Sequence, residues 1–232
     1  MGKDWKDPYY KYIVTKRKKP VTIDVTASIP PFKVPSPSLS DVVADFKVRK
    51  FKTVLDFGAG KLRNSIFLLE QNFKVWAVEF KEAFETPAGK QRLEEAKNFG
   101  KQSSGKKFFY LEYPKDFFRF NKTLDAALLI NVVNIIPEES HRKKILRACA
   151  KHIRPGGMLL FMVQYGEPHY RPGVTKRLKL KDGWCYGLHK ARQTFYKPYS
   201  IPEIKSLIPS RLFKEERKIV AAHHRAFLFQ RK

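Results

Sequence analysis

The sequence is poor in cysteine and in long hydrophobic runs, and each shortage excludes a class of protein. The 2 cysteines, Cys149 and Cys185, are too few for a disulfide framework or a thiolate zinc site, so we expect no metal centre. No segment approaches the roughly 18 uninterrupted apolar residues of a membrane span. Residues 1–7 lack the apolar core of a secretion signal. We therefore expect a cytoplasmic protein without membrane contact.

Acidic residues are also scarce: 22 Asp and Glu residues stand against 47 Lys and Arg, which gives a net charge of +25. Such a charge attracts phosphate polymers or anionic membranes, although selection for solubility produces the same excess. The charge therefore favours a polyanionic partner but identifies no substrate. Hydrophobic residues make up 43% of the chain, which excludes wholesale disorder. A length of 232 residues suits one α/β domain with modest additions.

The N-terminal part of the chain differs in composition from the rest. Two β-rich runs, residues 10–15 and 21–26, flank a short basic segment, which predicts a hairpin with a basic tip. The tip could hold a phosphate backbone or be a solvated turn. Four prolines make residues 27–38 an extended connector. We expect an extension over residues 1–38 and a main domain over residues 39–232.

Beyond the connector, strand-like and helix-like segments alternate. The predicted strands are residues 53–56, 74–79, 108–111, 126–130 and 158–163. The predicted helices are residues 64–71, 87–99 and 138–152, after a short one over 41–46 that Ser38 or Ser40 can cap. This alternation predicts a parallel sheet that is covered by helices on both faces.

The alternation ends after the last of these strands. Residues 164–199 are polar, aromatic and basic without a clear period, and we expect a substrate loop or cap there. Residues 202–208 then predict a short helix. Residues 218–222 and 226–230 predict a closing antiparallel pair of strands.

Residues 54–65 carry the most informative pattern, a buried strand that ends at Asp56 and turns through two glycines into a helix. Glycine lets a ligand approach the backbone closely, and the start of the helix offers free N–H groups. The turn does not fit a phosphate-binding P-loop, because Leu55 stands where the first glycine should be. It fits a dinucleotide fingerprint poorly, since Arg63 takes the place of a third small residue.

Residues 56–65, with the letters D-F-G-A-G-K-L-R-N-S, resemble the first motif of the Rossmann-like, class I S-adenosylmethionine-dependent methyltransferases. The resemblance implies S-adenosylmethionine as cofactor and an α/β fold with a mostly parallel seven-stranded sheet, flanking helices and an antiparallel C-terminal strand. It implies that Asp56 lies near the amino-acid part of the cofactor and that Glu79, ending the next strand, holds the ribose hydroxyls. The full set of cofactor-binding residues that we carry over is Asp56, Gly58, Ala59, Gly60, Asn64, Glu79, Phe80, Asp116 and Asn131.

The resemblance extends to segments on both sides of the turn. Residues 60–65 and 73–78 resemble the tellurite-resistance-type methyltransferases, in which Gly-Arg-Asn-Ser opens the first helix, while Leu62 takes the place of the usual third glycine. Residues 154–160 resemble the family's turn into the fifth strand. Asn131 would lie beside the methionine portion of the cofactor and the substrate. It could instead be a helix cap or turn former.

The methyl acceptor is less well defined. Amino-group methyltransferases acting on adenine or cytosine resemble one another in an Asp/Asn-Pro-Pro-aromatic motif, where this chain has Asn-Val-Val-Asn at residues 131–134. Residues 164–199 mix cations with aromatic side chains, which suits stacking on bases, although such a loop can also merely anchor itself to the core. Tyr165 and His169 are the candidate catalytic residues for orienting or deprotonating an acceptor.

Two hypotheses for the function follow. A nucleic-acid methyltransferase, acting on RNA or DNA, is favoured by the charge, the basic hairpin tip and the aromatic-basic segment. A small-molecule or oxyanion methyltransferase is favoured by the Gly-Arg-Asn-Ser resemblance and by the lack of a separate nucleic-acid-binding domain. We favour nucleic acid as the partner on electrostatic grounds. A non-enzymatic binding module with the same fold is the third alternative.

Overall fold

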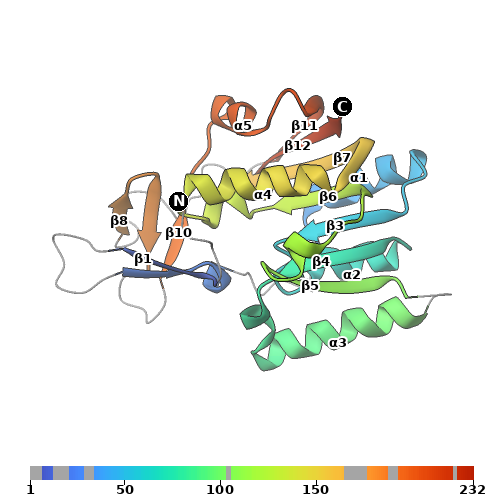
Figure 1. Cartoon of the computed structure of the whole chain (residues 1–232), viewed down its shortest axis with the longest axis horizontal. Coiled ribbons are helices and arrows are strands. Elements are labelled where there is room, and N and C mark those ends of the chain that lie inside the picture. Colours follow the sequence, from blue (N-terminus) through green and yellow to red (C-terminus); the bar gives the residue numbers. More distant parts are fainter. Residues whose placement is uncertain are drawn as a thin grey trace.

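A seven-stranded sheet forms the centre of the protein, in the order β11-β12-β7-β6-β3-β4-β5 (Figure 1). The structure is a computed structural model that describes residues 7–12, 21–28, 34–102, 106–164, 177–187, 193–221 and 224–232. The sheet strands are β3 Thr53–Phe57, β4 Lys74–Glu79, β5 Phe108–Glu112, β6 Leu124–Ile130, β7 Ile153–Gln164, β11 Phe213–Ala221 and β12 His224–Arg231. β3 to β7 run parallel, and β12 lies antiparallel between β7 and β11. The predicted fold class is therefore confirmed.

Helices cover both faces of this sheet. They are α1 Pro37–Val48, α2 Arg63–Glu70, α3 Pro87–Gln102, α4 Glu139–Lys151 and α5 Ile201–Leu207. α1, α2 and α3 pack in one apolar cluster, whereas α4 and α5 pack in the other. Successive side chains of β4 alternate between the clusters, with Trp76 and Val78 on the α4 face and Val75 and Ala77 on the opposite face. The apolar runs of the sequence are continuous because both faces are buried.

Two predicted boundaries are wrong. Helix α1 begins at Pro37, so neither Ser38 nor Ser40 caps it: Ser36 is the N-cap residue, and Pro37 fits the first turn because its missing N–H would be unpaired there. The connector accordingly ends before residue 38. Strand β7 begins at Ile153 rather than 158, and it passes through the segment that resembled a turn, with Gly156 at a φ of 75° and a register shift opposite.

The described part of residues 164–199 contains regular structure that its irregular pattern did not predict. Three short strands, β8 Arg177–Leu180, β9 Gly183–Tyr186 and β10 Thr194–Tyr196, form an antiparallel sheet in the order β10-β9-β8. The strands are too short for a period to emerge from their side chains. We call this three-stranded sheet the cap sheet.

The predicted N-terminal hairpin is present as β1 Tyr9–Tyr12 and β2 Val21–Asp24, paired antiparallel; its basic tip lies outside the described residues. Ile23 bridges to Gln193 beside β10, which places the hairpin against the cap sheet. Both lie beyond one end of the central sheet, next to the start of α4 (Figure 1). The N-terminal segment thus reaches the edge at which the parallel strands end.

A buried arginine connects the cap sheet to the central domain. Arg142 of α4 is 1% exposed, donates to the carbonyl oxygens of Ile136 and Pro137 at 2.7 and 3.0 Å, and pairs with Asp182 in the β8–β9 turn. Lys197 continues the chain of charges, since its Nζ lies 3.0 Å from Asp182. α4 and the cap sheet are therefore joined by a charged contact that is largely shielded from water.

We expect Arg142→Met to lower the free energy of unfolding by about 2 kcal/mol, because it leaves the carbonyl oxygens of Ile136 and Pro137 without this donor and removes one of the two cations beside Asp182. Urea denaturation measures the change. Lys143→Met, at the adjacent exposed position, is the matched control and should change stability by less than about 0.5 kcal/mol. Equal losses in the two variants would show that the pair contributes nothing specific.

Candidate functional site

The turn between β3 and α2 is the centre of the candidate site. Gly58, Gly60 and Leu62 all have left-handed φ angles, of 70°, 56° and 62°. A Cβ at Gly58 would come within 2.5 Å of a Val132 methyl carbon, so only glycine fits there. The N–H groups of Gly58 and Ala59 both donate to the carbonyl oxygen of Val78, at 2.9 and 3.1 Å. The turn is thereby fixed to β4.

Leu62 stands where the methyltransferase motif usually has its third glycine. It keeps the left-handed conformation that glycine adopts easily, which costs leucine roughly 1 kcal/mol. Its side chain is fully buried in the cluster under α1 and α2, and such burial contributes about 2 kcal/mol. Packing therefore offsets the strain, and the turn keeps its geometry without glycine.

Glu79 closes the site at the end of β4. Its carboxylate accepts hydrogen bonds from the N–H of Gly60 at 2.7 Å and of Phe80 at 2.9 Å. Only 8% of the residue is exposed, and this burial raises the pKa of Glu79 to about 7, although both N–H groups favour the charged form. Each carboxylate oxygen retains a lone pair that can accept from a ligand hydroxyl.

Asp56 lies underneath the turn. It is 1% exposed and accepts a hydrogen bond from the Ser65 hydroxyl at 2.6 Å, which ties the start of α2 to β3. Burial raises the pKa of Asp56 to about 6, against the opposing effects of Ser65 and the nearby Arg63. Two acidic residues thus lie on adjacent strands, and burial disfavours the charged form of each. A positively charged ligand bound nearby would stabilise both carboxylates.

The remaining predicted cofactor residues have contacts of different kinds. The side-chain oxygen of Asn64 accepts from the backbone N–H of Ser36 at 3.0 Å and so holds the start of α1. The Asp116 carboxylate accepts from the N–H of Glu112 at 3.1 Å and closes the loop after β5. Phe80 is buried and packs edge-on against Tyr113, with ring centroids 5.2 Å apart. These residues shape the backbone around the site.

Asn131 follows β6 at the same edge of the sheet. Its φ is 58°, and its N–H donates to the carbonyl oxygen of Met162 at 2.8 Å. Its buried side-chain oxygen has no hydrogen-bond donor among the described residues, and in the fully buried Asn134 the amide oxygen likewise lacks a donor and the amide nitrogen lacks an acceptor. A buried, unpaired polar atom costs about 1–3 kcal/mol. Asn131 therefore offers an acceptor to a ligand at this edge.

Sequence reasoning missed the part of this edge formed by the hairpin. The Tyr10 hydroxyl lies 2.9 Å from Nδ1 of His141, and the Tyr12 hydroxyl donates to Glu138 at 2.6 Å. These contacts join residues 131 and 126 positions apart in the chain. No local pattern contains a signal for such a distant pairing.

Some predictions concern features that the structure does not place in the site. Tyr165 and His169 lie outside the described residues. Within the described ranges, no group of three or more His, Cys, Asp or Glu side chains could hold a metal ion. No helix in the same ranges is long and apolar enough to cross a membrane. Both cysteines are buried, and burial raises the pKa of the Cys149 thiol.

Solved structures with the same fold exist, although the sequence matches no protein-family model and no curated protein. An S-adenosylmethionine-dependent methyltransferase from Methanosarcina mazei is 12% identical, with 85% of this chain and 98% of that chain covered and a TM-score of 0.61. The 1,6-didemethyltoxoflavin-N1-methyltransferase of Burkholderia thailandensis, with bound 1,6-didemethyltoxoflavin and S-adenosylhomocysteine, is 17% identical, with 84% and 79% covered and a TM-score of 0.57.

A third neighbour is the magnesium protoporphyrin IX methyltransferase of Synechocystis, with bound S-adenosylhomocysteine. It is 13% identical, 84% of this chain and 82% of that chain are covered, and the TM-score is 0.57. At these identities the similarity establishes the fold, which is that of the class I S-adenosylmethionine-dependent methyltransferases. The similarity to tellurite-resistance-type enzymes stays a prediction.

We expect stability to fall with rising pH because of Glu79. Burial raises its pKa from 4.5 to about 7, so the folded protein holds a proton that the unfolded chain has lost. The stabilisation is complete below pH 4.5 and disappears as the pH rises through about 7. Glu79→Gln, which stays neutral, should show a shallower fall in urea denaturation over this range. The exposed variant Glu70→Gln should keep the wild-type slope; a wild-type slope in Glu79→Gln as well would contradict the expectation.

Proposed function

We propose that the protein is an S-adenosylmethionine-dependent methyltransferase whose cofactor lies across the carboxyl ends of β3, β4 and β6. The observation that carries this proposal is the carboxylate of Glu79, held at the end of β4 by the N–H of Gly60 in the glycine turn. The fold supports it, because ligands of open α/β sheets bind at this edge of the strands.

The described residues fit the cofactor chemically. Glu79 has free lone pairs for two ribose hydroxyls. The buried side-chain oxygen of Asn131 has no donor within the described ranges, which suits the ammonium group of the methionine portion. Burial raises the pKa values of Asp56 and Glu79, and the positive charge of a sulfonium would favour their ionised forms.

When bound, the cofactor supplies an electrophilic methyl group. The protein's own task is then to align an acceptor and to exclude water. A general base is needed only for an acceptor that is poorly ionised. The hairpin and the cap sheet stand beside the start of α4 at the same edge, and they are the elements that we expect to hold the acceptor.

For the acceptor, a small molecule has better support than a nucleic acid. Two neighbours are named for small molecules, a toxoflavin precursor and magnesium protoporphyrin IX. No nucleic-acid enzyme stands among the neighbours described above. The nucleic-acid acceptor favoured by the sequence remains the second candidate, and the observation in its favour is the net charge of +25.

We expect S-adenosylmethionine to bind the wild-type protein in isothermal titration calorimetry and Glu79→Gln to weaken binding at least about tenfold. A hydrogen bond to a charged acceptor contributes roughly 1.5–3 kcal/mol, and the amide can no longer accept through both of its atoms. Proton release at pH 6.5 is a second signature, because a sulfonium favours the ionised carboxylates.

The control for this titration is Glu70→Gln, which removes the same charge from the exposed end of α2 and should bind like the wild type. Absence of binding heat in the wild-type protein would refute the proposal. Equal affinity in Glu79→Gln would remove the role assigned to this carboxylate.

We expect radiolabel from S-adenosylmethionine to enter the metabolite fraction of a cell extract rather than its RNA, DNA or protein. Turnover should change little between about 50 and 200 mM salt, whereas binding through many phosphates would weaken roughly a thousandfold or more. Labelled nucleic acid together with a steep salt dependence would select the second candidate instead.

A further inference from the structure

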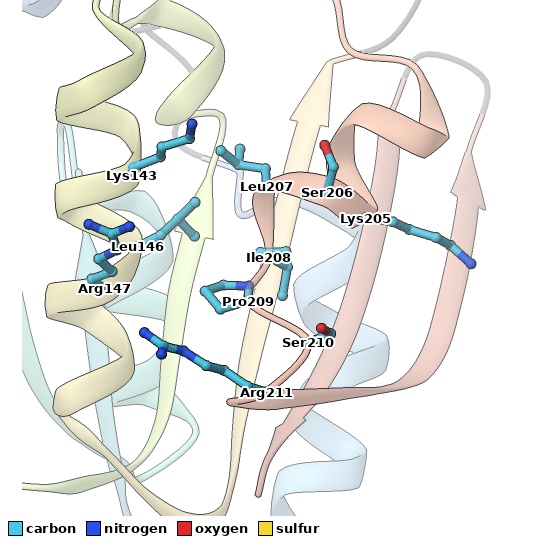
Figure 2. Close-up of a pocket in the computed structure, with 10 residues that line it drawn as sticks. All are labelled: Lys143, Leu146, Arg147, Lys205, Ser206, Leu207, Ile208, Pro209, Ser210 and Arg211. Atoms are coloured by element: carbon cyan, nitrogen blue, oxygen red, sulfur yellow. The ribbon is translucent and has the colours of Figure 1, made fainter.

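An open pocket lies away from the cofactor edge, between the middle of α4 and the segment that leads from α5 to β11. It has a volume of about 440 Å³. Its floor is apolar, since Leu146 and Ile208 are 1% and 4% exposed. Figure 2 shows Lys143 and Arg147 on one wall, and Arg211 reaching from the loop after α5 toward the same helix.

The lining of this pocket is cationic. It includes four basic residues and no acidic one. Two of the four are neutralised, because Lys143 pairs with Glu139 at 2.5 Å and Lys205 pairs with Glu215 at 3.1 Å. The ammonium group of Lys205 also points away from the pocket in Figure 2.

The other two cations, Arg147 and Arg211, are exposed. Neither forms an ion pair with another residue in the part of the chain that the structure describes. They come from elements more than 60 positions apart in the sequence, yet they border one pocket. The fold therefore places at one pocket two guanidinium groups that have no acidic partner among the described residues.

Guanidinium groups bind phosphate through two parallel hydrogen bonds, which makes arginine the preferred residue for recognising it. The exposed cations of α4 also suit a chain of phosphates better than a single phosphate group. Arg147 and Lys151 are both exposed and lie four residues apart on one side of α4, which spaces these two cations about 6 Å apart along the helix. Cations at such a spacing match the repeating charges of a polyanion, and the net charge of +25 attracts one from a distance.

We propose that the pocket between α4 and the α5–β11 segment is a docking site for the phosphate backbone of a nucleic-acid strand. Arg147 and Arg211 clamp a phosphate, and Lys151 of α4 contacts the strand beyond the pocket. The site goes beyond the methyl-transfer function and does not rest on it. A nucleic acid bound here is a partner of the protein, whichever molecule accepts the methyl group.

The test is fluorescence anisotropy of a labelled single-stranded oligonucleotide with the full-length protein over a series of salt concentrations. The double variant Arg147→Ala/Arg211→Ala should bind roughly tenfold or more weakly at about 0.1 M salt. Its plot of log affinity against log salt should be shallower by about 0.7, since the two arginines hold one phosphate and each lost phosphate contact on a single strand contributes about 0.7.

The charge-matched control is Lys205→Ala/Lys214→Ala. It removes two positive charges from the same region, where both lysines pair with glutamates, at 3.1 and 3.3 Å. This control should weaken binding less than threefold. Equal losses in the two double variants would show that net charge alone governs binding and would overturn the proposal, as would absence of oligonucleotide binding by the wild type.

Two further ligands separate the nucleic acid from other polyanions: polyglutamate and phosphatidylserine vesicles. If the arginine variant loses affinity for either of them as strongly as for the oligonucleotide, the assignment to a nucleic-acid backbone is wrong. Circular dichroism and the calorimetric affinity for S-adenosylmethionine should be unchanged in both double variants. These readouts separate the docking site from the cofactor site, because either can fail while the other holds.

Discussion

The hydrogen bond from the N–H of Gly60 to the Glu79 carboxylate is the contact on which the candidate site depends. Together with the bonds from Gly58 and Ala59 to the Val78 carbonyl, it fixes the turn after β3 against the end of β4. The arrangement has an electrostatic cost, because burial disfavours the charged form of the carboxyl group. A bound cation would offset that cost, which links the stability of the turn to its occupancy.

Apolar packing of the helices against the sheet determines where this hydrogen bond lies. Polar contacts determine which other elements lie around it. Two helical layers bury the sheet on both faces, so the carboxyl edge is where its polar residues gather. The Arg142–Asp182 pair then attaches the cap sheet to α4. The same helix presents exposed cations on its outer surface. α4 therefore separates an edge suited to a small cofactor from a face suited to a long anion.

Several residues that resemble cofactor ligands also hold the protein together. Asn64 fastens α1, and Asp116 closes a loop; whether they contact the cofactor as well stays a prediction. The charge of the chain led us to favour a nucleic-acid acceptor, whereas two of the three named neighbours are named for small molecules. Net charge describes a long-range field, and it does not specify which part of the surface meets a substrate. A polyanion can therefore be a partner without being the acceptor.

The sequence alone determined the parallel sheet, its flanking helices and the glycine turn, because these depend on hydrophobic period and on residues that are neighbours in the chain. It did not determine the start of α1, where Pro37 follows Ser36, or the cap sheet, whose strands have 4, 4 and 3 residues. Only the tertiary structure decided that Tyr10 meets His141 and that Arg147 and Arg211 border one pocket. Such contacts join distant segments through the geometry of the packed sheet, and no short window of sequence contains that geometry.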